Sequence, residues 1–179
     1  MKKILSALLA LLLLTSMVAC DAPTSTTQLP TPTPRETATT SIVTFADPVL
    51  EAIVRGAMGK PSGDITVAEA KTVASLNLAF AEWQKYVSEN EPIRSIAGLE
   101  SFANLESLDL SGNAITDLAP LSALTNLKAL ILTGCAAEDY TPLASLTNLH
   151  VLMLDHSTIA DPTPLLALSN LNCLYLEGS

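Results

Sequence analysis

Residues 99–120, LESFANLESLDLSGNAITDLAP, carry the pattern that predicts the fold, because the chain repeats it with a period of 22 residues. The following units are LSALTNLKALILTGCAAEDYTP (121–142), LASLTNLHVLMLDHSTIADPTP (143–164) and LLALSNLNCLYLEGS (165–179). Leucine occupies four offsets in every unit: Leu99, Leu121, Leu143 and Leu165; Leu105, Leu127, Leu149 and Leu171; Leu108, Leu130, Leu152 and Leu174; Leu110, Leu132, Leu154 and Leu176. One unit cannot bury these leucines alone, so the period predicts a solenoid of stacked repeats.

Within one unit, Leu108-Asp109-Leu110 alternates apolar and polar residues, which is typical of a half-buried strand. We expect both leucines to point inward and Asp109 to point outward. Asn113 follows at a turn, where its amide can satisfy open backbone groups. Pro120 limits the return path to turns or short helical stretches. The expected fold class is an α/β solenoid with a parallel concave sheet and an irregular or short-helical convex side.

These spacings resemble the leucine-rich repeat, and the 22-residue period with Leu-Thr-Asn-Leu at 124–127 and 146–149 resembles the internalin-like class of bacterial surface proteins. The resemblance covers residues 45–179 and implies a helical N-terminal cap at 45–72. It also implies a non-catalytic, adhesion-type role in binding a protein or another envelope or host ligand. The resemblance predicts the fold but does not identify the ligand, because one scaffold serves many ligands.

The predicted cap has its own signals. Asp47 and Pro48 are typical of a helix start, and Leu50, Ile53, Val54 and Ala57 share one helical face. Gly59, Pro61 and Gly63 end that helix. Thr66 and Glu69 then form a capping-box pattern that predicts a second, short helix.

The repeats depart from regularity in three places. A first unit, residues 73–98, matches through Val73, Leu76 and Leu78, but it carries an inserted segment at 79–92. The turn asparagine is replaced along the chain: the position holds Asn113, Cys135, Ser157 and Ser179. The last unit is incomplete, which leaves the final strand edge and its leucines exposed.

The first nineteen residues resemble a lipoprotein signal peptide, with Lys2 and Lys3 before an apolar run and Met17-Val18-Ala19-Cys20 at the place of a lipobox. The resemblance implies lipid on Cys20 and localisation on the outer side of the bacterial cell membrane. Residues 20–44 are rich in Thr and Pro and predict a disordered tether. Without residues 1–19 the formal net charge changes from −9 to −11. So acidic a chain repels phosphate backbones, which argues against a nucleic-acid partner.

The sequence contains no catalytic motif and predicts no metal or cofactor. His150, Asp155 and His156 lack a further residue at a metal-like spacing, so we interpret the histidines as surface residues. Cys135 and Cys173 lie two strands apart, roughly 9.6 Å, whereas a disulfide needs Cα atoms within about 7 Å. We therefore expect two free thiols, with Cys173 the more exposed.

The outward residues of the strands form three rows on the concave face. The central row is Asn77, Asp109, Ile131, Met153 and Tyr175; the preceding row is Ser75, Ser107, Ala129, Val151 and Cys173; the following row is Ala79, Ser111, Thr133, Asp155 and Glu177. The second half of this face is apolar, which favours contact with a partner. The predicted partner-binding residues are Asp109, Ala129, Ile131, Thr133, Val151, Met153, Asp155, Tyr175 and Glu177. Three alternatives stay open: a further C-terminal segment that covers this face, a structural fragment without activity, and an accessory subunit of an envelope enzyme.

The inserted segment carries Phe80, Trp83 and Tyr86, with Phe80, Trp83 and Val87 at helical spacing. Pro92 predicts that such a helix ends by Glu91. Two interpretations remain. The helix packs on the cap, or it leans over the concave face and brings Trp83 and Tyr86 to the rim of the binding site.

Overall fold

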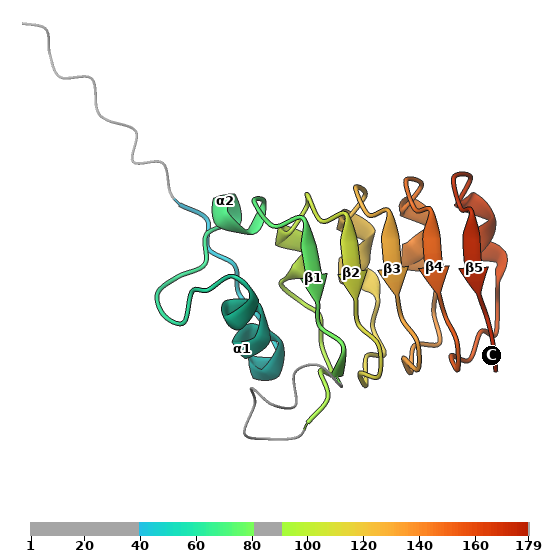
Figure 1. Cartoon of the computed structure of the whole chain (residues 1–179), viewed down its shortest axis with the longest axis horizontal. Helices are drawn as coiled ribbons and strands as arrows, with labels where there is room; N and C mark the ends of the chain where they lie inside the picture. The colour runs from blue at the N-terminus through green and yellow to red at the C-terminus, as the bar shows by residue number, and fades with distance from the viewer. Residues whose placement is uncertain (1–39, 81–90, 179) are drawn as a thin grey trace, which may run out of the picture. The chain divides into compact units, whose positions relative to one another are not determined.

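Five three-residue parallel strands run in chain order through the computed structural model, which describes residues 40–80 and 91–178 (Figure 1). The strands are β1 (Ser75–Asn77), β2 (Ser107–Asp109), β3 (Ala129–Ile131), β4 (Val151–Met153) and β5 (Cys173–Tyr175). Each pairs with the next in the register that the repeat predicts, for example Leu130 with Leu152. The leucine-rich repeat solenoid expected from the sequence is therefore confirmed.

The leucines at the repeated offsets form the core. Leu108, Leu130 and Leu152 are each 0% exposed. The leucines two residues later in the same repeats, Leu110, Leu132 and Leu154, are also 0% exposed. Residues between them, such as Asp109 and Ile131, are half-buried on the opposite side of each strand. Inward leucines and outward variable residues thus alternate as predicted.

Short 3-10 turns form the convex side, behind the strands in Figure 1. They are η1 (Leu99–Ser101), η2 (Ala119–Ala123), η3 (Thr141–Ser145) and η4 (Thr163–Ala167). A proline stands at the start of η2, η3 and η4. The predicted restriction of this side to turns or short helical pieces is confirmed.

Two helices cover the β1 end of the sheet, α1 (Pro48–Ala57) and α2 (Val67–Ala70) (Figure 1). Asp47 caps α1, and Thr66 and Glu69 form the predicted capping box of α2. Leu50, Ile53 and Val54 are buried in the same core as the repeats. Ala57, expected on their face, is instead exposed, because it is the last residue of α1 and extends past that core.

The packed region begins earlier than expected. The sequence predicts a disordered tether up to residue 44, yet Val43 is 8% exposed and its N–H donates to Ile65 O at 2.7 Å. Ile42 also forms an isolated bridge with Thr66. These backbone bonds tie the segment to the cap, a long-range pairing that the local composition does not indicate.

Two polar ladders tie successive repeats together. The amides of Asn126, Asn148 and Asn170 each donate to a carbonyl of the preceding repeat at 2.8–2.9 Å, and the amide of Asn104 donates to Lys71 O in the cap at 2.8 Å. At the other turn, Asn113 donates to Leu78 O at 2.8 Å, Cys135 to Leu110 O at 3.5 Å and Ser157 to Leu132 O at 3.1 Å. A thiol and a hydroxyl therefore replace the amide as donors, while Ser179 lies outside the described residues.

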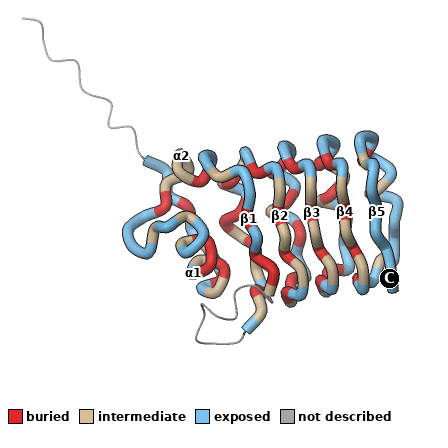
Figure 2. Tube along the Cα trace, in the orientation of Figure 1, coloured by how far each residue is buried: buried red, intermediate tan, exposed pale blue. Residues whose placement is uncertain are grey.

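Burial decreases at β5. Leu174 and Leu176 are 42% and 43% exposed, in contrast to 0% for Leu152 and Leu154 at the same offsets. Figure 2 shows the same change, with β5 exposed along its length. Among the described residues no strand packs on the far side of β5, so its leucines are more exposed than those of β4.

The predictions for residues 81–90, including Trp83 and Tyr86, lie outside the described residues, as do those for the signal peptide and Cys20. At the start of the insertion, Phe80 N–H still donates to Ser111 O at 2.9 Å, so the ladder of the sheet reaches that residue. In the parts of the chain that the structure describes, no helix has both the length and the apolar character needed to cross a membrane.

Candidate functional site

The strand face carries the three rows of outward residues that the sequence predicts. Parallel pairing places Asp109 beside Ile131, Ile131 beside Met153 and Met153 beside Tyr175. The same pairing aligns Ala129, Val151 and Cys173 in the preceding row. Neighbouring strands lie about 4.8 Å apart, so these side chains form one continuous surface, which we call the strand face.

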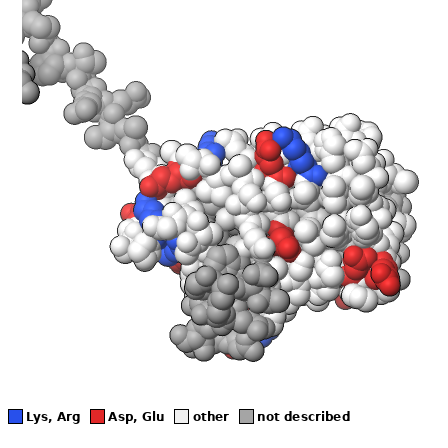
Figure 3. Space-filling view, viewed as in Figure 1, with Lys and Arg blue, Asp and Glu red and all other residues white. Residues whose placement is uncertain are grey.

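The strand face divides into a polar and an apolar half. Over β1 and β2 it presents Ser75, Asn77, Ser107 and Asp109. Over β3 to β5 it presents an apolar patch, which consists of Ala129, Ile131, Val151, Met153 and Tyr175. The first four are half-buried and Tyr175 is 48% exposed. Figure 3 shows this side of the molecule as largely uncharged, with acidic atoms in a few small groups and basic atoms beside some of them.

Carboxylates lie at or just beyond the carboxyl ends of the strands, with Asp109 in the central row and Asp155 and Glu177 in the following row. Asp109 Oδ1 accepts hydrogen bonds from Ser111 N at 2.9 Å and Ser111 Oγ at 2.5 Å. Asp155 Oδ1 accepts from Glu177 N at 2.7 Å. His156 N–H donates to Glu177 O at 2.8 Å, which continues the β4–β5 ladder and keeps Asp155 and Glu177 adjacent. Two acidic residues therefore lie side by side at one border of the apolar patch.

His156 stands at a turn that the other repeats build with glycine. Its φ is 57°, and Gly112, Gly134 and Gly178, one period apart, have φ of 72°, 69° and 71°. A left-handed backbone is unfavourable for residues with a Cβ. His150 is exposed, with Nδ1 2.7 Å from Asn148 O. Both histidines are thus exposed: His156 has a left-handed backbone, and the side chain of His150 contacts a backbone carbonyl.

The thiols differ sharply in accessibility. Cys135 and Cys173 are both free; Cys135 is buried and Cys173 is exposed. Burial raises the pKa of the Cys135 thiol to about 12. A protonated, buried thiol is a poor nucleophile, so Cys135 contributes packing and one hydrogen bond.

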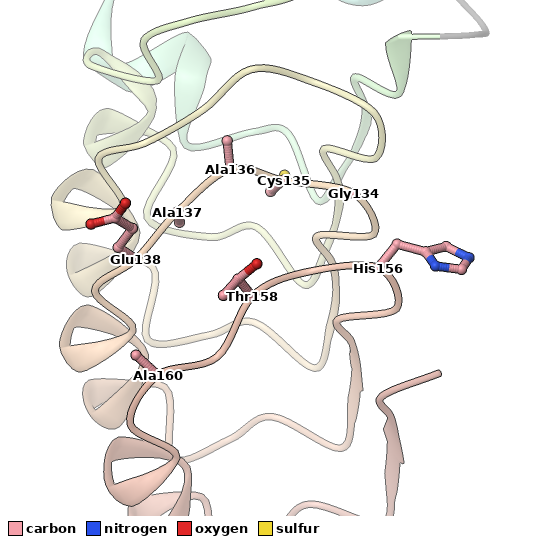
Figure 4. A pocket seen from close by; sticks show the side chains of 8 residues that line it. All are labelled: Gly134, Cys135, Ala136, Ala137, Glu138, His156, Thr158 and Ala160. Atoms are coloured by element: carbon pink, nitrogen blue, oxygen red, sulfur yellow. The ribbon is translucent and has the colours of Figure 1, made fainter. Parts of the chain in front are cut away.

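A depression of about 550 Å³ lies beside the strand face, between the loops that leave β3 and β4 (Figure 4). Small residues line most of it: Gly134, Ala136, Ala137 and Ala160. Figure 4 shows Glu138 and His156 at opposite ends with their side chains pointing apart. The residues that line this depression therefore bring no acid and base together for catalysis. Within residues 40–80 and 91–178, no three His, Cys, Asp or Glu side chains gather in a way that could hold a metal ion.

Comparisons with known proteins agree with this geometry. A family model described as Leucine Rich repeats (2 copies) matches residues 103–145. The chain is similar to an internalin (inlF) of Listeria monocytogenes, at 34% identity and a TM-score of 0.67, over 74% of this chain and 37% of that chain. It is also similar to an internalin C2 (inlC2) of the same organism, at 31% identity and a TM-score of 0.54, over 74% of this chain and 65% of that chain.

This chain is an internalin-like leucine-rich repeat protein. It spans less than two thirds of the length of either internalin. A comparison with curated proteins gives no match. The assignment rests on the similarity to the two internalins, together with the fold, the strand register and the leucine spacing.

Sequence reasoning missed two residues of the internalin-like repeat. Tyr140 stands at the offset of the core residue Leu118 and is 1% exposed; its burial raises the pKa of the phenol. The left-handed turn at His156 was also missed. The signal for it was present in the sequence, because Gly112, Gly134 and Gly178 recur at that offset.

Proposed function

We propose that this protein is an adhesion-type binding module of the bacterial envelope, anchored by lipid on Cys20, and that its ligand contacts the strand face. The internalin-like fold supports a protein-binding role in general. The chemistry of the strand face supports this surface as the location of the binding site, because contiguous patches of solvent-facing apolar side chains are common at interaction sites.

The observation that carries the proposal is the alignment of Ile131, Met153 and Tyr175 on adjacent strands. These positions face away from the core, since Leu130 and Leu152 fill the inward positions beside them. Folding therefore does not require large apolar residues there. A polar residue would serve the solenoid equally well, as Asn77 and Asp109 do in the same row. The rim residues Trp83 and Tyr86, proposed as further contacts, belong to the same hypothesis.

Site-specific photo-cross-linking tests the proposed location. A photoreactive amino acid is placed at Met153 on the strand face and, as a matched control, at exposed Ala123 on η2. We expect discrete adducts with one partner from position 153 and none from position 123. Adducts from position 123 alone, or the same background from both, would place the site elsewhere.

The anchor is tested separately. Cys20→Ser should move the protein from the membrane fraction to the soluble fraction, because its acyl chains supply the membrane attachment. Cys173→Ser is the matched control and should stay with the membrane. A Cys20→Ser protein that still sediments with membranes in high salt would refute the lipid anchor.

A further inference from the structure

The charges around the strand face indicate what kind of partner it fits. None of the fifteen residues in its three rows is Lys, Arg or His, whereas Asp109, Asp155 and Glu177 are acidic. Across residues 105–178, eight acidic residues accompany a single basic one, Lys128. Lys128 already pairs with Glu106, with Nζ and Oε1 2.8 Å apart. The electrostatic potential over the apolar patch is therefore negative.

The acidic border of the apolar patch consists of Asp155 and Glu177, and it favours a positively charged ligand group. Asp155 and Glu177 follow adjacent strands, whose backbones lie about 4.8 Å apart, so both acidic residues contribute negative charge to the same part of the surface. The bond from Glu177 N to Asp155 Oδ1, at 2.7 Å, fixes the Asp155 side chain and lowers the entropy lost when a ligand binds. A positive side chain placed near them would be attracted to both.

We propose that the strand face binds a protein segment that combines large apolar side chains with adjacent Lys or Arg residues. The apolar side chains pack on Ile131, Val151 and Met153, and the basic side chains reach Asp155 and Glu177 at the carboxyl ends of β4 and β5. This proposal rests on the proposed function, because it specifies the chemistry of the partner for the same face.

The apolar and the acidic components contribute differently. Apolar contact on Ile131 and Met153 supplies most of the affinity, because burial of apolar surface is the main favourable term in association. The carboxylates add selectivity and speed of association, and that part is screened by salt. Partners with Asp or Glu at the corresponding positions are excluded by repulsion.

Selection from a random library of phage-displayed dodecapeptides tests the proposal on the purified full chain. We expect the enriched peptides to contain Lys or Arg next to large apolar residues. Their binding should fall at least tenfold on Ile131→Ser/Met153→Ser and at least threefold on Asp155→Asn/Glu177→Gln. It should also weaken at least threefold between 0.05 and 0.5 M NaCl, on the order of the screening expected for exposed charges. Glu138→Gln, which removes an exposed carboxylate outside the rows, is the matched control and should leave binding unchanged.

Two other results have distinct meanings. Peptides that depend on Ile131 and Met153 but are neutral or acidic, and that bind equally at both salt concentrations, would overturn the basic partner while the strand face remains the site. Peptides whose binding is unaffected by Ile131→Ser/Met153→Ser would overturn both this proposal and the proposed function.

Discussion

The imidazole of His156 lies over the α-carbon of Gly178, so that a Cβ added at residue 178 would stand 2.6 Å from His156 Nδ1. The two residues hold the same turn position in successive repeats, and both have left-handed backbones. Glycine at 178 therefore makes room for the larger residue that replaces glycine at 156. This contact explains how one repeat tolerates a departure from the turn pattern.

We expect His156→Gly to stabilise the protein by about 0.5–1 kcal/mol, because relief of the left-handed strain exceeds the added entropy of the unfolded chain. Urea unfolding measures the difference. Gly134→Ala is the reverse change in the preceding repeat, where the nearest atom to an added Cβ is 4.0 Å away. It should cost about 1–2 kcal/mol from backbone strain alone. A loss of stability in His156→Gly would show that the ring makes a favourable contact that outweighs the strain.

The cap and the first repeat are joined by one carboxylate. Asp47 Oδ1 accepts from the N–H groups of Val49 and Leu50 at the start of α1, and Oδ2 accepts from Arg94 N at 2.7 Å and Ser95 N at 3.2 Å. We expect Asp47→Ala to lower the free energy of unfolding by about 2–4 kcal/mol, since it removes both a helix cap and charge-assisted bonds. Asp64→Ala, an exposed aspartate between the two helices, should change it by less than about 0.5 kcal/mol. Similar small effects of both substitutions would mean that the cap docks without Asp47.

Stacking predicts that one substitution has different costs in different repeats. Leu152→Ala removes a fully buried side chain and should cost about 2–5 kcal/mol. Leu174→Ala, at the same offset in β5, removes a side chain of a residue that is 42% exposed and should cost about 1 kcal/mol. Ala129→Ser on the strand face should have little effect. Equal losses from Leu152→Ala and Ala129→Ser would contradict the inward and outward register.

The thiols should react at very different rates. In a Cys20→Ser background, a thiol reagent at pH 8 should label one equivalent rapidly, at exposed Cys173. Cys135 should react only after unfolding, because it is buried and its pKa is raised to about 12. A Cys135→Ser variant that still shows one rapid equivalent identifies the labelled residue. Rapid labelling of two equivalents in the folded protein would contradict the burial of Cys135.

Repetition explains how much of this fold could be predicted from the sequence. Leucine offsets set the inward positions, and the strand register then places Ile131 and Met153 in one row. The period also located the turn donor, although Cys135 and Ser157 replace asparagine there. Each of these features recurs every 22 residues, so a position that is ambiguous in one repeat can be assigned from the other repeats.

The remaining features occur once and depend on distant contacts. Asp47 was predicted as a helix cap, but its bonds to Arg94 and Ser95 join residues nearly fifty positions apart. Nothing in the local sequence indicates such a pairing. The early start of the packed region at Ile42 and Val43 has the same cause, because both pair with the segment at Ile65 and Thr66. The sequence also predicts the outward rows and their acidic residues, whereas the hydrogen bond from Glu177 N to Asp155 Oδ1 could not be predicted from it.

Isothermal titration calorimetry tests whether the strand face is the binding site. It compares the wild type with Ile131→Ser/Met153→Ser in binding to the partner that cross-links at Met153. Both residues face away from the core, so the double variant should melt within a few degrees of the wild type, on the order expected for surface substitutions. We expect its dissociation constant to rise at least tenfold, because it loses the centre of the apolar patch. An unchanged dissociation constant in a variant that is folded and equally stable would contradict binding through the strand face.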